Sequence, residues 1–357
     1  MMAELLLLGH DTIECAYPLG RDARGGLDFE RLAATKEALR ASKVRHAAPV
    51  RLGQEEFLLA PHGTASGYPF LLANGVFSVQ CGPTNTPSFF VTYRSFGLWQ
   101  FGAMHLHERF LSWAASVGFI PVARERLSRV DFSFDYRLAD IDFTEEHFVT
   151  QAAKDNKHRL HGRDQTFRFG EGQLVLRVYD KCAEIQEKSA KTWFHDLWGT
   201  DRDVWRIEWQ VRKEWLRRFG IRTLEGLFER QGDLLRVLAN EHTTLRKPTA
   251  DSNRSRWPVH PLWRDLQARI AKLEGHGVYR ELAPERLRDE RMLRLAISVY
   301  GYLKRMAAIR GLSTENEQVT LEHAMVALAQ RLKTLHEPVS WGLDVRRRID
   351  EMRLGPW

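Results

Sequence analysis

Apolar and polar positions alternate in short segments up to Leu216, and beyond it apolar residues recur with helical spacing. Side chains alternate between the two faces of a strand, so a period of two predicts strands, and apolar residues three or four apart predict helices. Because strands and helices alternate in one block, the expected class is α+β. Strands are expected at Ile13–Tyr17, Glu56–Leu59, Val76–Cys81, Phe89–Tyr93, Arg129–Tyr136, Gln165–Phe169, Leu174–Tyr179 and Val204–Arg212. Helices are expected at Asp28–Ser42, with Asp28 as N-cap, at Met104–Val117 and at Thr144–Lys154.

The chain after Leu216 is rich in Leu, Arg, Glu and Ala and predicts a mainly helical C-terminal region. The polar segment Thr243–Trp257 is interpreted as a linker or exposed loop. We therefore expect an α+β domain over residues 1–219 and a helical region over residues 220–357, for DNA binding or oligomerisation. Its helices are expected at Arg222–Leu238, Leu262–Leu273, Glu285–Arg310 and Leu321–Leu335. The third of these helices carries an apolar stripe that is interpreted as core packing and consists of Met292, Leu295, Val299, Tyr302 and Met306.

Three of the expected strands combine an apolar face with a face of ionisable residues. Mixed charge in the middle of strands displaces the β-branched residues that strands prefer, which favours a functional surface. If the strands are neighbours, Asp131, Asp135 and Glu208 converge on a hard divalent cation, which prefers oxygen ligands. A solvated sheet face with cross-strand ion pairs is the alternative. The polar faces carry Arg129, Asp131, Ser133 and Asp135 on the first strand; Val175, Arg177, Tyr179 and Lys181 on the second; and Arg206, Glu208, Gln210 and Arg212 on the third.

This set of groups suits transesterification on a phosphodiester. A tyrosine hydroxyl is a poor nucleophile near neutral pH because its ordinary pKa is about 10. Lys181 or a metal ion close to Tyr179 is expected to favour the phenolate, and a metal would also offset charge on the phosphate. Attack leaves a phosphotyrosine and a free 3′-hydroxyl, and the cut can be resealed without ATP.

The segments RVDFSFDY, LRVYDKCAEI and WRIEWQVR, which begin at Arg129, Leu176 and Trp205, resemble the successive core motifs of the replication initiation factor (Rep-trans) family. That family contains rolling-circle initiators of plasmids and phages and relaxases of conjugative elements. The resemblance covers roughly residues 67 to 219. It implies a fold similar to that of HUH nucleases, a central antiparallel sheet flanked by helices, and a tyrosine nucleophile with Mg²⁺ or Mn²⁺.

Carried onto this chain, the resemblance implies Tyr179 as the nucleophile and Asp131 and Glu208 as the metal-holding acids. Asp135 belongs to the same strand motif as Asp131. Lys181 is expected near the scissile phosphate, and Arg206 is expected to brace Glu208 or a phosphate. The predicted DNA-binding residues are Arg129, Arg177, Arg206 and Arg212. Cys182 stands where the family often has a small or polar residue, which hardly affects the assignment.

One histidine-containing motif is set aside. His105-Leu106-His107 resembles the His-hydrophobe-His triplet of HUH nucleases, but the spacing of Leu106, Phe110 and Trp113 predicts a helix. Residues two apart on a helix point in different directions and do not share an ion.

The charge of the chain favours a polyanionic partner. Lys and Arg number 53 against 46 Asp and Glu, a formal net charge of +7, and 24 of the basic against 18 of the acidic residues follow Phe219. Basic surfaces bind DNA by releasing the counterions of phosphates. Three scattered cysteines and the absence of a long apolar run lead us to expect a cytoplasmic protein without a disulfide framework or a membrane partner.

The leading hypothesis is a rolling-circle replication initiator that nicks and joins one strand of origin DNA, single-stranded or extruded as a hairpin. A host helicase, a polymerase and a second copy of the chain are further expected partners. The alternatives are a mobilisation relaxase of a conjugative element, a non-catalytic origin-binding regulator on the same sheet, and a nuclease that activates water on a metal.

Overall fold

The computed structural model describes residues 3–22, 26–42, 47–152, 155–160, 163–275, 284–314 and 319–354. The chain forms two compact units, Met1–Tyr279 and Arg280–Trp357. The division lies well beyond the boundary expected after residue 219, because the helices that follow this residue pack on the sheet of the first unit.

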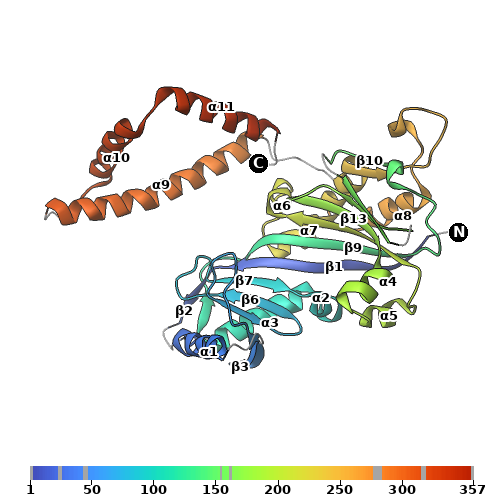
Figure 1. The fold of residues 1–357 in the computed structure, drawn as a ribbon, viewed down its shortest axis with the longest axis horizontal. Coiled ribbons are helices and arrows are strands. Elements are labelled where there is room, and N and C mark those ends of the chain that lie inside the picture. Colours follow the sequence, from blue (N-terminus) through green and yellow to red (C-terminus); the bar gives the residue numbers. More distant parts are fainter. Residues whose placement is uncertain are drawn as a thin grey trace. The chain divides into compact units, whose positions relative to one another are not determined.

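The first unit is built on an eleven-stranded sheet, and each pair of neighbouring strands in it is antiparallel (Figure 1). This confirms the α+β class, the central antiparallel sheet and the flanking helices. From one edge to the other the strands are β11 (Asp155–Leu160), β12 (Arg163–Phe169), β13 (Leu174–Asp180), β14 (Val204–Arg212), β9 (Arg126–Arg137), β1 (Glu4–Tyr17), β7 (Phe89–Tyr93), β6 (Phe77–Cys81), β5 (Phe70–Ala73), β4 (Glu55–Leu59) and β3 (Ala48–Leu52).

One face of the sheet carries the main hydrophobic core. The helices α3 (Ala103–Ser116), α7 (Leu224–Val237) and α8 (Pro261–Ile270) cover this apolar face. Trp263 of α8 meets Trp209 of β14 with ring centroids 5.7 Å apart, and Phe110 of α3 meets Tyr17 of β1 at 4.5 Å. The large aromatic rings of alternate strand positions thus become the core, as the period of two predicts.

The opposite face is partly covered by a smaller core. Here α4 (Lys181–Glu184), a π-helical turn (Ile185–Ser189) and α5 (Trp193–Trp198) follow β13, and α2 (Ser95–Phe101) contacts β1. The buried residues of this smaller core are Cys182, Ile185, Phe194 and Trp198, together with Val204 of β14. This cover lies over one end of the strands and leaves the polar positions at their other end for the candidate site.

The remaining elements of the first unit lie around this frame. The helix α1 (Phe29–Ala41) begins after Asp28, whose side chain accepts a hydrogen bond from the Arg31 amide at 2.8 Å, so the predicted N-cap is confirmed. Two small sheets pair β2 (Leu19–Arg21) with β8 (Phe119–Pro121) and β10 (Phe148–Thr150) with β15 (Thr243–Leu245). Short helices are α6 (Lys213–Arg218) and the 3₁₀ turns Glu145–His147 and Arg254–Arg256.

Two expectations about local structure are wrong. The segment Thr144–Lys154 is not a helix: its described part forms a 3₁₀ turn and then β10, while residues 153 and 154 lie outside the described residues. The segment Thr243–Trp257 is not simply an exposed loop, because β15 begins it and Thr243 is fully buried. In both cases the pairing of β10 with β15, residues far apart in the chain, decides the conformation.

The second unit consists of the helices α9 (Pro284–Thr314), α10 (Leu321–Leu335) and α11 (Pro338–Leu354), which confirms a helical C-terminal region. The stripe on α9 that was expected in a core is exposed within this chain: Met292 is 68% and Tyr302 64% exposed. Helix α9 instead packs on α10, where Leu303 and Ala324 are buried. None of the helices in the described ranges is both long and apolar enough to cross a membrane.

Candidate functional site

The three strands with polar faces are neighbours in the sheet, in the order β13, β14, β9. Their register places Tyr179 opposite Arg206, and Glu208 opposite both Arg177 and Ser133. Asp131 faces Gln210 across β9 and β14. The polar residues of the three strands therefore form one continuous patch on one side of the sheet, here called the polar face.

Tyr179 and Glu208 are in direct contact. The Tyr179 hydroxyl donates a hydrogen bond to Glu208 Oε2 at 3.0 Å, and Arg177 donates to Glu208 Oε1 at 2.7 Å. The same guanidinium donates to the side chain of Gln210 at 2.8 Å. Tyr179 is 9% exposed and Arg177 is 28% exposed, so the phenol is buried and the arginine is partly open to solvent.

Asp131 lies beside this pair. Arg129 donates to both of its oxygens, at 2.8 and 2.5 Å, and also reaches Glu14 at 3.4 Å. Burial raises the pKa of Asp131 to about 6, and the negative charge of Glu208 adds to the rise while Arg129 opposes it. Asp131 and Glu208 are thus close enough to repel each other, and each is neutralised by an arginine.

Asp135 and Arg206 lie opposite each other on the polar face, as the alternation predicts, but their partners differ from those expected. Arg206 is fully buried and donates to both oxygens of Asp135, at 2.6 and 2.8 Å, and to Asp11 at 2.7 Å. Trp198 donates to Asp135 as well, at 2.9 Å. The expectation that Arg206 braces Glu208 is therefore corrected, since Arg206 binds Asp135 and Asp11. Both oxygens of Asp135 are bound to Arg206 and both side chains are fully buried, so neither residue is open to a metal ion or a DNA phosphate in this structure.

Lys181 begins α4 directly after β13. Its ammonium group donates to Glu184 at 2.5 Å and lies 5.6 Å from the centre of the Tyr179 ring. The side chain is 3% exposed, and burial lowers its pKa. Lys181 is therefore next to Tyr179, as expected. Its ammonium group lies over the Tyr179 ring and donates to Glu184, and not to Glu208, which accepts the hydrogen bond of the Tyr179 hydroxyl.

The surroundings of Tyr179 oppose ionisation of its hydroxyl. Burial raises the pKa of Tyr179 well above its ordinary value, the charge of Glu208 raises it further, and Arg206 lowers it to a lesser extent. Lys181 or a metal ion was expected to favour the phenolate; among the cations near Tyr179, it is Arg206 that lowers its pKa in this structure. These surroundings favour a neutral phenol that donates its proton to Glu208.

The residues fit a divalent cation in part. In the portion of the chain that the structure describes, no group of three or more His, Cys, Asp or Glu residues is arranged to hold a metal ion, so the expected trio of acids is not formed. Asp131 and Glu208 remain as two adjacent carboxylates. Mg²⁺ is commonly held by one or two carboxylates, with water and substrate phosphate completing its shell. Ser133, between them on the polar face, has a fully buried hydroxyl with no hydrogen-bond partner among the described residues.

The predicted DNA-binding arginines differ in their exposure to solvent and in their ion pairs. Arg129 and Arg177 are 20% and 28% exposed and are bound to the acids of the site. Arg212, at the end of β14, is partly exposed and forms no ion pair within the described ranges. Arg168 was not predicted; it is exposed on β12 and lies opposite Arg177, and the alternation in Gln165–Phe169 was the signal for it.

Asp11 was also missed. It accepts hydrogen bonds from Arg206, from Ser95 at 2.8 Å and from Lys191 at 3.2 Å. The register between β1 and β9 shifts between His10 and Thr12, and this bulge turns Asp11 to the polar face. A period-two reading of β1 does not reveal an extra residue in the strand.

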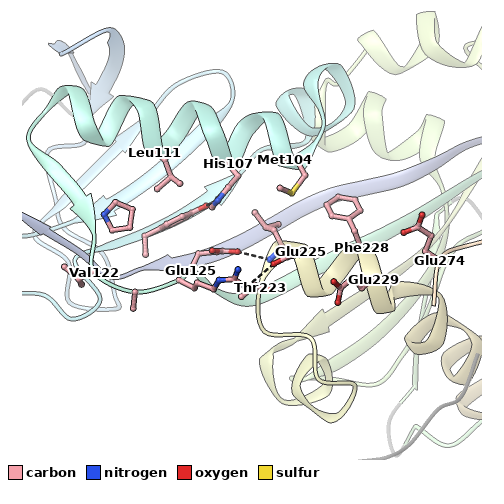
Figure 2. A pocket seen from close by; sticks show the side chains of 15 residues that line it. Met104, His107, Leu111, Val122, Glu125, Thr223, Glu225, Phe228, Glu229 and Glu274 are labelled. Carbon is pink, nitrogen blue, oxygen red and sulfur yellow. Dashed lines mark hydrogen bonds and ion pairs between the residues drawn. The ribbon is translucent and has the colours of Figure 1, made fainter. Parts of the chain in front are cut away.

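A cavity of about 710 Å³ lies on the apolar side of the sheet, between α3 and α7. Figure 2 shows Met104, His107 and Leu111 on one wall and Phe228 on the other. The Tyr17 hydroxyl contacts His107 Nδ1 at 2.7 Å. His105 and His107 lie on α3, which confirms the helical prediction for this triplet.

No family model and no curated protein matches the chain. Among solved structures, the Rolling Circle Replication Initiator Protein from Geobacillus stearothermophilus is matched with a TM-score of 0.43 and 18% sequence identity. The match covers 74% of this chain and 96% of that chain. At this level of similarity, the function is inferred from the residues of this chain.

Proposed function

We propose that this protein nicks and rejoins one strand of DNA through a covalent phosphotyrosine on Tyr179, as an initiator of rolling-circle replication. The observation that carries the proposal is the 3.0 Å hydrogen bond from the Tyr179 hydroxyl to Glu208, with Asp131 on the same face. A general base must lie within hydrogen-bond reach of the proton it accepts, and Glu208 does.

In the reaction, Tyr179 Oη forms a bond to the phosphorus and the bond from phosphorus to O3′ breaks. The phenolic proton passes to Glu208, and the departing O3′ takes a proton from water. The product is a 5′-phosphotyrosine and a free 3′-hydroxyl. Attack by a 3′-hydroxyl reverses these steps and joins the strand, because the phosphotyrosine keeps the bond energy.

We further propose that Asp131 and Glu208 hold Mg²⁺ or Mn²⁺. Such a cation, when bound, offsets negative charge on the phosphate and favours the ionised phenol. Arg129 and Arg177 neutralise the two acids in this structure, and we propose that they turn to DNA phosphates in the complex. Arg212 and Arg168, which was not predicted, add two further basic side chains to Arg129 and Arg177.

The second candidate is a non-catalytic DNA-binding regulator. The observation that favours it is the low exposure of Tyr179, 9%. Both candidates bind DNA, and only the first forms a covalent bond with it. A relaxase of a conjugative element uses the same chemistry as an initiator and differs in the DNA that it recognises.

The test is a denaturing gel of the protein with single-stranded and supercoiled origin DNA of its own replicon and Mn²⁺. We compare the wild type with Tyr179→Phe and with Tyr136→Phe, whose hydroxyl donates to Asp265 at 2.9 Å on the apolar face. The wild type and Tyr136→Phe are expected to form the adduct and Tyr179→Phe is not. An adduct with Tyr179→Phe shows that the nucleophile is another residue. Tight binding without any adduct from the wild type supports the regulator.

A further inference from the structure

Ser133 has an unusual position in the middle of the polar face. Its residue pairs are Glu208 on β14 and Gly9 on β1, and Asp131 is two positions away on the same face of β9. The side chain is fully buried, and its hydroxyl has no hydrogen-bond partner among the residues that the structure describes. A buried hydroxyl without a partner costs free energy, and an alanine would avoid that cost while leaving only the small volume of one oxygen atom empty.

The oxygen atoms near Ser133 divide into two groups. Both oxygens of Asp135 are taken by Arg206 and Trp198 in a fully buried cluster. Asp131 and Glu208 are bound only by side chains that are partly exposed or neutral, namely arginines and a phenol. A cation that enters the polar face therefore meets Asp131, Glu208 and Ser133.

Two carboxylates fill only part of the coordination shell of a hard divalent cation. Mg²⁺ prefers near-ideal octahedral geometry with oxygen ligands, so its other positions are open to water, substrate phosphate or a further protein oxygen. A serine hydroxyl is a hard oxygen ligand for this ion, as in the phosphate-binding loops of nucleotide hydrolases. The hydroxyl of Ser133 is the unpartnered oxygen next to both acids.

We propose that the Ser133 hydroxyl is the third protein ligand of the cation that Asp131 and Glu208 hold. This inference rests on the proposed function, which calls for the cation. It explains why a serine stands at a buried position where the hydroxyl has no other partner. It also makes Ser133, and not Asp135, the third member of the site that the sequence pattern predicted on β9.

Titration of the full-length protein with Mn²⁺ in the absence of DNA tests the inference, with isothermal calorimetry and the electron paramagnetic resonance of free Mn²⁺ as readouts. The variants are Ser133→Ala and the control Ser128→Ala, at the partly buried bulge of β9 opposite Glu14 and Cys15. Ser133→Ala is expected to weaken Mn²⁺ binding about tenfold or more, the scale seen when a metal site loses a supporting group. Ser128→Ala is expected to bind as the wild type does.

Thermal unfolding of the metal-free proteins separates a ligand from a packing residue. Because Ser133→Ala removes an unpartnered hydroxyl, its unfolding temperature without metal is expected to equal or exceed that of the wild type. The shift of the unfolding temperature by Mn²⁺ is expected to shrink in the same variant. If Ser133→Ala lowers the metal-free unfolding temperature and leaves Mn²⁺ affinity unchanged, Ser133 is a packing residue and the inference is overturned.

A thiol at this position gives a second signature. Ser133→Cys is expected to shift the preference from Mn²⁺ toward Cd²⁺ and to show thiolate-to-cadmium absorption in the ultraviolet, since soft ligands select soft ions. Ser128→Cys and the wild type, with buried Cys15, Cys81 and Cys182, are the controls. Failure of the wild type to bind Mn²⁺ contradicts the metal in the proposed function. Mn²⁺ binding that Ser133→Ala and Ser133→Cys leave unaltered contradicts only the role of Ser133.

Discussion

The hydroxyl of Tyr179 and the carboxylate of Glu208 are joined by a 3.0 Å hydrogen bond across the neighbouring strands β13 and β14. The sheet sets this contact, because both side chains project from the polar face at adjacent positions of the register. The contact has two opposite effects. It provides an acceptor for the phenolic proton, and its negative charge helps to keep that proton in place.

Glu208→Gln separates these effects. The variant keeps the size of the side chain and removes its charge, so the pKa of Tyr179 is expected to fall toward its ordinary value of about 10. The rate of adduct formation is nevertheless expected to drop by about a hundredfold or more, since the base and a proposed metal ligand are lost. Single-turnover kinetics measure the rate. Glu14→Gln, which removes a half-buried acid of the same face, is the matched control and is expected to stay within about threefold of the wild type.

The ion pair of Asp135 with Arg206 is expected to stabilise the fold more than any exposed pair. Asp135→Asn leaves a fully buried guanidinium with Asp11 as its remaining acid, and breaking such a pair costs about 3–5 kcal/mol. The exposed pair of Arg137 with Glu4 is the control, and Glu4→Gln is expected to cost less than about 1 kcal/mol. Urea unfolding measures both. Equal losses in the two variants would contradict a structural role for the buried pair.

The free energy of unfolding is expected to depend on pH through His242. Its side chain is 9% exposed against Trp215, and burial lowers its pKa from 6.5 to about 4. The unfolded chain binds a proton near pH 6.5 and the folded chain does not, so this stabilisation is complete above pH 6.5 and is lost as the pH falls toward 4. Between pH 7 and pH 5 the wild type is expected to lose about 2 kcal/mol through this group. His242→Gln removes the group, and its urea unfolding at the two pH values is expected to differ by that much less.

A side chain at position 9, beside the site, is expected to clash with its surroundings, because Gly9 is closely packed. A Cβ at this position would lie 2.9 Å from the ring of Trp99, which covers β1 there. Gly9→Ala is therefore expected to cost about 1–3 kcal/mol, the usual penalty of overpacking. Gly75→Ala is the control, because no atom lies within 4 Å of a Cβ at that turn. Chemical denaturation compares the two, and a loss at Gly75 as large as that at Gly9 would point to a backbone effect.

The alternation of residues along three strands correctly predicted the polar face and the approach of Tyr179, Asp131 and Glu208. Alternation defines which residues share a face, and the adjacency of the strands then brings them together. It does not define partners on that face. The pairing of Asp135 with Arg206, and the burial of both, depends on the cover by α5, whose aromatic residues carry no signal of the surface they contact.

The sequence-based predictions for the second half of the chain were incomplete for a similar reason. Helical spacing located α7, α8, α9 and α10, but an apolar stripe does not tell which surface buries it. Helices α7 and α8 pack on the sheet, whereas the stripe of α9 is exposed in this chain. The strand β10 was not predicted. It has three residues and forms by pairing with β15, which lies far from it in the sequence, so no local pattern indicates it.

The place of β1 in the sheet has a consequence for biosynthesis. This strand is made before the other ten strands of the sheet, yet it pairs with β9 from Glu4 to Ala16, and with β7 from Ile13 to Tyr17. A ribosome must therefore deliver more than a hundred further residues before the long ladder of β1 closes, and contacts of such sequence separation make folding slow. Until β9 emerges, one edge of a nascent half-sheet is open to other chains, so fast translation or crowding of unfinished chains is expected to favour aggregation of this protein.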